Sequence, residues 1–341
     1  MNESRVDAIA RAVLYEGYVL YPYRPCVKTR QRWTFGGVLP RGYVAHAAAG
    51  DLDHMQNQCL VAAGGEARLS VRARFLHLMN RRVQAGPEFR DVPSLRAGAC
   101  AYQAWQEAVE REVGIEDLPM EELVGGAVRQ TFSFPASQTE QIIREEGKPI
   151  GRLVREQHPV SGRVEISAEG APGDLVRLMV RVSNTTPVNE EIDRDRAMLQ
   201  AFASTHLILH LDAGAFMSMT DPPATAATAA AACENIGCWP VLVGEPGQTD
   251  TLLASPIILP DYPQIAPESP GDLFDGCEID EILTLRIMTL TDEEKRQATA
   301  VDPRVMALME RTQSLARDQL MNLHGTMRNV APLSPEVRYG G

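Results

Sequence analysis

The sequence contains few lysines, few aromatic residues and no long apolar run. Only three of the 33 basic residues in the 341-residue chain are lysine, so arginine supplies almost all of the positive charge. No stretch approaches the roughly 18 uninterrupted apolar residues that a membrane helix needs. The apolar part of the first twenty residues is interrupted by Asp7 and Glu16, which a secretory signal would not contain. We therefore expect a cytoplasmic protein without a membrane span.

The sequence also lacks the motifs of common enzyme classes. It contains no GxSxG elbow, no P-loop, no GxGxxG after a strand and no HExxH. No Ser–His–Asp set can be argued from spacing, and no recognised motif requires a cofactor. These absences favour a non-enzymatic protein but leave enzymatic activity open.

The composition is nevertheless that of a folded protein. Apolar residues make up 44% of the chain and charged residues 23%, which excludes a disordered chain. The formal net charge of −12 disfavours a nucleic-acid partner. Six cysteines are spread through the chain, and without an export signal we expect reduced thiols.

Apolar and polar residues alternate along much of the first half of the chain, the period expected of half-buried strands. Two such stretches, 55–63 and 67–84, flank the pair Gly64-Gly65, which predicts a β-hairpin. The alternation slips after Phe75, and this predicts a β-bulge that changes the buried face.

Helices are predicted at two places in the same half. Residues 5–17 carry apolar side chains near a 3.6-residue spacing, with Gly17 as a suitable C-cap. Residues 101–113 are also predicted to be helical. The segments 164–166 and 175–182, joined by a glycine-containing turn, predict two antiparallel strands of a sandwich.

The second half of the sequence mixes helical and strand patterns. The expected fold class is α+β, with a β-rich portion (1–187) containing an antiparallel sandwich-like sheet and a mixed α/β portion (188–341) ending in helices. The boundary is soft, and the two portions could equally form one unit. The elements expected after residue 187 are a helix over 191–204 with Asn189 as its cap, a strand over 205–214, an alanine-rich helix over 224–233, strands over 238–245 and 252–260, a helix opened by the capping box Thr291–Glu294, and a helix over 303–326.

The first candidate site is a segment, here called the tyrosine–arginine segment, that mixes aromatic rings with cations and contains no acid. Such a mixture can hold single-stranded nucleic acid, although the net charge opposes that partner. Arginine forks also suit the carboxylates of an acidic protein or an anionic ligand. The plainer alternative is that the tyrosines pack at a helix–strand junction and the arginines pair with acids elsewhere in the chain. The candidate residues are Tyr18, Tyr21, Tyr23, Arg24, Arg30, Arg32 and Trp33.

The second candidate site is an acidic segment late in the chain. Carboxylates at this density could bind a hard cation or a basic partner, but their spacing does not fit an EF-hand loop. Acids ahead of an apolar run also suit a helix N-terminus on a solvated face. The candidate residues are Asp272, Asp275, Glu278, Asp280 and Glu281.

Metal binding is an alternative function, and its candidate ligands are Cys233, Cys238, Asp272 and Asp275. The two cysteines are not a CxxC pair, and no second pair completes a zinc site, so buried structural thiols are the competing interpretation. His206 and His210 lie on the predicted strand, where they would be roughly 13 Å apart, too far to share one ion. The segment HAAAGDLDH (46–54) is weakly metal-like, but a surface loop explains it as well.

Three segments resemble a known protein family. They are VLYEGYVLYPYRPCVKTRQRWTFGG (13–37), the hairpin between 162 and 187, and the stretch 238–298, which contains EIDEILTLRIMTLTDEEK. The family is an uncharacterised conserved one, of the actinobacterial type, encoded in gene clusters for uptake-type NiFe hydrogenases. The resemblance implies a cytoplasmic accessory protein in hydrogenase assembly or maturation. The implied partner is a hydrogenase subunit or a maturation protein.

Overall fold

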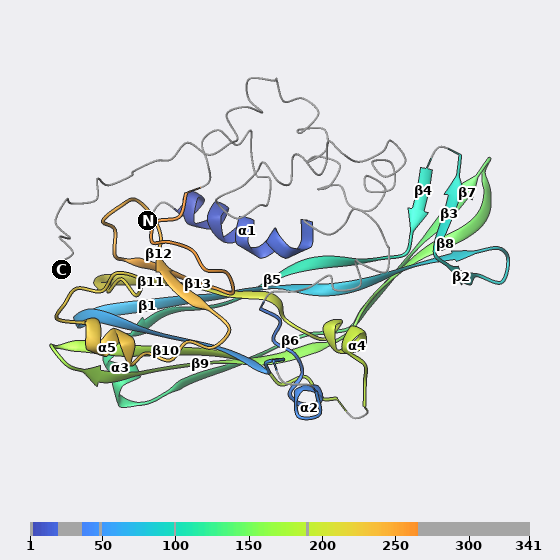
Figure 1. Cartoon of the computed structure of the whole chain (residues 1–341). Coiled ribbons are helices and arrows are strands. Elements are labelled where there is room, and N and C mark those ends of the chain that lie inside the picture. The colour runs from blue at the N-terminus through green and yellow to red at the C-terminus, as the bar shows by residue number, and fades with distance from the viewer. Residues whose placement is uncertain (1–2, 20–35, 48–49, 99, 189–190, 265–341) are drawn as a thin grey trace, which may run out of the picture.

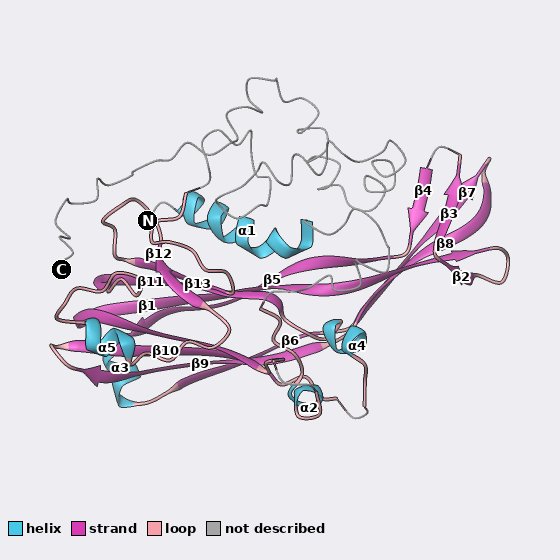
Figure 2. Ribbon diagram, viewed as in Figure 1, coloured by secondary structure: helices cyan, strands magenta, loops and turns pink. Residues whose placement is uncertain are grey.

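The computed structural model describes residues 3–19, 36–47, 50–98, 100–188 and 191–264 (Figure 1). Strands greatly outnumber helices in this part of the chain (Figure 2). The elements are α1 (Glu3–Val19), α2 (Arg41–Val44), β1 (His54–Ala85), β2 (Arg90–Val92), β3 (Ser94–Ala97), β4 (Cys100–Gln103), β5 (Trp105–Pro119), α3 (Met120–Gly125), β6 (Val128–Phe134), β7 (Ser137–Glu145), β8 (Lys148–Gln157), β9 (Val160–Ala171), β10 (Leu175–Asn184), α4 (Arg194–Met198), β11 (Ala203–Phe216), α5 (Ala227–Ala231), β12 (Trp239–Leu242) and β13 (Thr251–Ser255).

The long strand β1 connects all parts of a large antiparallel sheet. Its first part pairs with β10, its middle lies between β11 and β5, and its end lies between β8 and β2. The sheet order among the described residues is β12-β13-β11-β1-β10-β9-β6, with β2, β5 and β8 also on β1 and β7 on β8. The expected β-rich fold with an antiparallel sheet is therefore confirmed.

The predicted hairpin at Gly64-Gly65 is wrong in its pairing, although the chain does bend there. The segments on either side of the glycines both belong to β1 and do not pair with each other. The register with β11 shifts between Ala63 and Arg68, opposite Ala213, whose φ is +58°. Figure 1 shows the first part of β1 in the layer of β9 and β10, and the later part in the layer of β5 and β11. The exposed glycines Gly64 and Gly65 therefore lie at the bend where β1 passes from one layer to the other.

The main core lies between these two layers. It includes Val71 of β1, Val113 of β5, Ile166 of β9 and Val180 of β10, all of them buried. Helix α1 covers the outer face of the β11–β13–β12 side, as expected from its amphipathic sequence. The layer that contains β5 and β11 therefore buries apolar side chains on both faces. This burial stabilises the fold by about 25 cal/mol per Å² of apolar surface removed from water.

The irregularity predicted near Phe75 is found, but the buried face does not change. The β1–β11 register shifts between Arg74 and Leu76, and the one extra residue belongs to β11, where Ser204 has a φ of +53°. Phe75 keeps to the inner core, with its ring centroid 4.5 Å from that of Phe202. Leu76 is buried on the outer face under α1. The alternation slips because both faces of β1 are covered at this point.

The helix predicted over 101–113 is wrong, because this segment forms β4 and the first part of β5. Strand β5 pairs with β1 from Arg81↔Trp105 to Arg68↔Pro119. Its residues Val113 and Ile115 enter the core at the two-residue spacing of a strand. Pairing along a long neighbouring strand outweighs the modest helical propensity of the segment.

The elements after residue 187 join the same sheet. The strands expected over 205–214, 238–245 and 252–260 are found as β11, β12 and β13, and β11 pairs directly with β1. The two portions assigned by sequence as 1–187 and 188–341 therefore share one sheet in the described part of the chain.

Two predicted helices of this half are shorter than expected. Helix α4 begins after Asp193, whose side chain accepts a hydrogen bond of 2.8 Å from the backbone of Arg196. Helix α5 is a short piece of the alanine-rich segment. Asn189, proposed as a cap, and the helices expected from residue 291 onward lie outside the described residues.

A set of strands extends beyond the two-layer body, and we call it the β-arm (Figure 1). It consists of the end of β1 together with β2, β3, β4, β7 and β8. It has a small apolar cluster of its own, built around Val83, Ile143 and Leu153.

Candidate functional site

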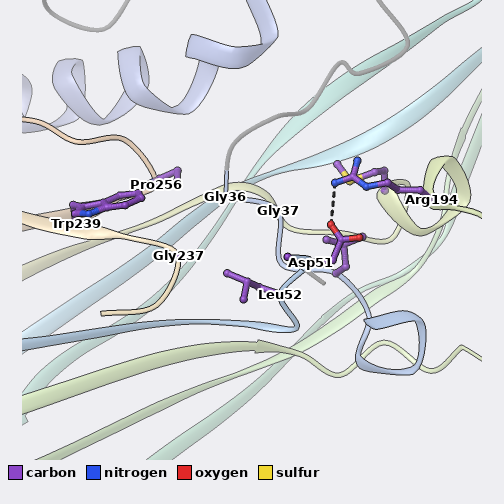
Figure 3. Close-up of a pocket in the computed structure, with 11 residues that line it drawn as sticks. Gly36, Gly37, Asp51, Leu52, Arg194, Gly237, Trp239 and Pro256 are labelled. Atoms are coloured by element: carbon purple, nitrogen blue, oxygen red, sulfur yellow. Dashed lines mark hydrogen bonds and ion pairs between the residues drawn. The ribbon is translucent and has the colours of Figure 1, made fainter. Parts of the chain in front are cut away.

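A recess of about 260 Å³ lies where five separate segments of the chain meet (Figure 3). The loop that contains Val38 is held between the start of β11 and the loop before β1, through Val38 N–H to Phe202 O (3.0 Å) and Leu39 N–H to Leu52 O (2.8 Å). The recess is lined by Gly36, Gly37, Leu39, Gly50, Asp51, Leu52, Arg194, Met198, Gly237, Trp239 and Pro256.

Glycines make the close approach of these segments possible. Gly36 has a φ of +54°, and a Cβ at this position would lie 2.5 Å from the Cβ of Pro256. Gly237 has a φ of +69°, and a Cβ there would lie 2.9 Å from Leu52 Cδ1. Only glycine combines this backbone conformation with the space available at the two positions.

An ion pair closes one side of the recess (Figure 3). The guanidinium of Arg194 donates to the carboxylate of Asp51 over 3.0 Å. The Asp51 side chain is only 17% exposed, whereas that of Arg194 is 52% exposed. The hydroxyl of Tyr43 also donates to Asp51, over 3.3 Å. Burial, and then the negative charge of Asp51, raise the pKa of the Tyr43 hydroxyl above its ordinary value.

The other side of the recess carries Trp239, an apolar side chain that is unusually exposed. Trp239 begins strand β12, and its backbone lies opposite Ser255 of β13. Its side chain is 46% exposed beside Pro256 (Figure 3). Asp51 and Arg194 are the ionisable side chains among the residues lining the recess. An indole on one side of a recess and a carboxylate–guanidinium pair on the other suit recognition of a partner that presents both apolar and polar groups.

The tyrosine–arginine segment leads into the recess along the chain, but its candidate residues cannot be placed. Tyr18 falls in the last turn of α1, where only the backbone is described. Tyr15, just before it, is buried, and its hydroxyl donates to Glu110 Oε1 over 2.6 Å. Tyr21, Tyr23, Arg24, Arg30, Arg32 and Trp33 lie outside the described residues.

The acidic segment also lies outside the described residues, so its carboxylates Asp272, Asp275, Glu278, Asp280 and Glu281 are not placed. Asp261, just before it, is described. Its carboxylate accepts hydrogen bonds from the backbone of Leu242 (2.8 Å) and from the hydroxyl of Ser218 (2.6 Å).

The two candidate cysteine ligands are held in hydrogen bonds to backbone carbonyls. The thiol of Cys238 donates to Gln56 O over 3.1 Å, and that of Cys233 donates to Ala229 O over 3.6 Å. Burial raises the pKa of the Cys238 thiol to about 12 and also raises that of Cys233. Both shifts disfavour the thiolate, which is the form of cysteine that ligates a metal. In the described part of the chain, no group of three or more His, Cys, Asp or Glu side chains could hold a metal ion.

The histidines of β11 lie on the predicted strand and have separate environments. His206 is fully buried, with Nδ1 3.2 Å from Ser204 O, whereas Nδ1 of His210 lies 3.1 Å from the hydroxyl of Thr251. In the metal-like segment 46–54, Asp53 contacts His54 at 2.7 Å, but Asp51 turns away toward Arg194.

Sequence reasoning identified neither Arg194 nor Trp239 as a site residue. The residues lining the recess come from positions scattered between 36 and 256, and no short motif joins them. The available signals were weak ones, namely the paired glycines at 36–37, Gly237 and the Trp239-Pro240 step.

No helix in the described residues is both long and apolar enough to cross a membrane. Comparison of the chain with protein-family models and with curated proteins found no match.

Proposed function

We propose that this chain is a non-enzymatic accessory protein that binds a protein partner through the surface around the recess. The proposed partner is a subunit or a maturation protein of a NiFe hydrogenase, in keeping with the family resemblance of the sequence. The observation that carries the proposal is the half-exposed Trp239, which lies across the recess from the Asp51–Arg194 ion pair.

The size and the residue types of the recess favour a protein partner over a cofactor. At about 260 Å³ the recess is slightly smaller than the roughly 300–1,000 Å³ of typical small-molecule sites. Tryptophan and arginine are the side chains that most often dominate the energetics of protein interfaces. A partner that covers Trp239 would bury apolar surface that is now in contact with water.

Two of the three segments that carry the family resemblance meet at this recess. Gly36 and Gly37 end the first of them (13–37), and Trp239 and Pro256 belong to the stretch 238–298. These segments are far apart in the chain, and their meeting at one recess supports a shared role for them in the family.

The proposal is tested by recovering partners from cells that express the cognate hydrogenase. We expect the chain to retain a hydrogenase subunit or maturation protein, and we expect Trp239→Ala to reduce the recovery about tenfold or more. Val124→Ala is the matched control, because Val124 is 51% exposed on α3 and does not line the recess. If the wild-type chain recovers no hydrogenase protein, the proposed partner is wrong. If Trp239→Ala behaves like the control, the binding surface is wrong.

The tyrosine–arginine segment is tested separately. Charge reversal at Arg24, Arg30 and Arg32 should weaken recovery of the partner if these arginines contact it. If they pair with acids of the same chain, the reversal should instead lower stability, which thermal unfolding would measure.

A further inference from the structure

Among the described residues, strand β7 is an edge strand with no second strand paired to its outer side. It pairs with β8 alone in the described part of the chain. The edge of β12 is treated differently: Leu242 N–H donates to the Asp261 carboxylate over 2.8 Å, and Tyr262 N–H donates to Leu242 O over 2.7 Å. The loop around residue 261 therefore satisfies the edge of β12, whereas β7 lies in the projecting β-arm (Figure 1).

The side chains of β7 make this edge accessible. Its first six residues, 137–142, are all exposed. Ile142 is 43% exposed, one of four large apolar side chains with such exposure in the described residues. Ile143, its neighbour, points the other way and is buried in the cluster of the β-arm. The pairing of β7 with β8 is regular from Ser137 to Ile143, and its register shifts between Ile143 and Arg144. The edge of an exposed strand is a template for another strand.

We infer that β7 pairs with β7 of a second copy of this chain, antiparallel, about a twofold axis at Ile142. In this register Ile142 faces Ile142 of the second copy, and Glu140 faces Arg144 of the second copy. The register shift after Ile143 places its extra residue, Ile150, in β8. Strand β7 therefore keeps its alternation, and residues 140, 142 and 144 lie on one face. Directly opposed side chains in such a pair lie about 4.5–5.5 Å apart at Cβ.

The charge pattern of β7 selects a second copy as the partner. The twofold axis generates the Glu140–Arg144 contact twice, once on each side of the central isoleucines, as required of a self-complementary interface. Arg152 already places the Glu140 carboxylate on this face, at 2.7 Å from its Nη1. A register centred one residue earlier, on Gln141, would instead place Glu140 against Ile142. Opposite charges directly across a strand pair stabilise the pairing. The register centred on Gln141 lacks this stabilisation, because it places a charged side chain opposite an isoleucine.

Sedimentation of the full chain over a range of concentrations tests this inference. We expect a concentration-dependent dimer for the wild type. Ile142→Lys should abolish it, because two ammonium groups would meet at the axis. Val124→Lys, at an exposed position on α3, should leave the dimer unchanged, and circular dichroism verifies that each variant is folded.

A charge swap tests the register. Glu140→Arg should weaken the dimer about tenfold or more by opposing two arginines on each side of the axis. Adding Arg144→Glu to that variant should restore the dimer, because a guanidinium at position 140 and a carboxylate at position 144 would again face each other.

A monomeric wild type at every concentration would overturn the inference, as would a dimer that survives Ile142→Lys. A charge swap that fails to restore the dimer would overturn the register. Ile142→Lys should still recover the partner of the recess, so failure here is distinguishable from failure of the proposed function.

Discussion

Two histidines are buried in the body of the protein, each with one ring nitrogen that has no hydrogen-bond partner among the described residues. Nε2 of His77 lies 2.9 Å from His158 O, and the nitrogens without a partner in this part of the chain are Nδ1 of His77 and Nε2 of His206. Burial lowers the pKa of both rings to about 4, and Arg111 beside His77 and Arg74 and Arg72 near His206 contribute in the same direction. Both residues are therefore neutral in the folded protein at pH 7.

Stability should consequently fall between pH 6.5 and pH 4. In this window the unfolded chain binds a proton at each histidine and the folded chain does not, so the free energy of unfolding decreases as the pH falls. The free energy of unfolding has its full value at pH values above about 6.5, the pKa of histidine in the unfolded chain. Between pH 7 and pH 5 we expect a loss of about 2 kcal/mol per histidine, measured by chemical denaturation.

His206→Phe provides the control for this prediction. The variant should lose about 2 kcal/mol less than the wild type over the same pH interval, because it removes one of the two titrating groups. An unchanged pH dependence in this variant would show that His206 does not titrate in this range.

A glycine at the recess should be far less tolerant of substitution than a glycine at the bend of β1. Gly36→Ala places a Cβ against Pro256 in a backbone with a φ of +54°, and we expect it to destabilise the protein by about 1–3 kcal/mol. Gly65→Ala meets no atom within 4 Å and should change the free energy of unfolding by less than about 0.5 kcal/mol. Urea unfolding of both variants measures the difference, and equal effects would contradict the geometry.

At the scale of elements, the root of the β-arm is tied by charge as well as by strand pairing. At this root the pairing partners of β1 change along the strand: β5 and β11 come first, and β2 and β8 follow. One carboxylate joins three strands: Glu107 of β5 accepts from Arg81 of β1 and Arg155 of β8, both over 2.8 Å. The side chain of Arg81 is only 7% exposed, and it also donates to the carbonyl of Gln103 over 3.0 Å.

Removing this carboxylate should therefore be costly. Glu107→Ala would remove the carboxylate that accepts from both the buried Arg81 and Arg155, and we expect a loss of about 3 kcal/mol in thermal or chemical unfolding. Glu88→Ala is the control, because the Glu88–Arg90 pair is mostly exposed and should contribute under about 1 kcal/mol. Similar losses in both variants would show that the Glu107 cluster is no more than a surface ion pair.

At the scale of the whole molecule, the body and the β-arm differ in how much apolar surface they bury. The body has a core between two layers and a second apolar cluster under α1, whereas the β-arm relies on the small cluster around Val83, Ile143 and Leu153. Strands β3 and β4 form a separate two-stranded sheet. Two-stranded sheets are marginal by themselves, so this pair depends on its packing against the rest of the β-arm.

Hydrogen exchange should resolve this difference. We expect amides of β3 and β4 to exchange at least about tenfold faster than those of β9 and β10, because local opening of the β-arm exposes less apolar surface than unfolding of the body. Uniform protection across both parts would mean that the β-arm and the body unfold as one cooperative unit.

Local sequence patterns predicted the elements whose burial shows in the spacing of their own apolar residues. The helix α1 and the strands β9 to β13 follow from apolar spacing, because one face of each packs on the core. The helix predicted over 101–113 failed because the pairing partner of β5 lies more than twenty residues away in β1. The slip after Phe75 was visible in the sequence, but its cause, a second buried face under α1, was not.

The sequence by itself determined an acidic chain rich in alternating strands, with arginine supplying nearly all of its cations, because composition and period are local properties. Only the tertiary structure decided that Asp51, Arg194 and Trp239 share a recess, and that β7 is, among the described strands, an edge strand of a projecting arm. Both depend on which distant strands pair and on where glycine allows two backbones to approach. Those contacts are chosen by burial across the whole chain, which no window of neighbouring residues contains.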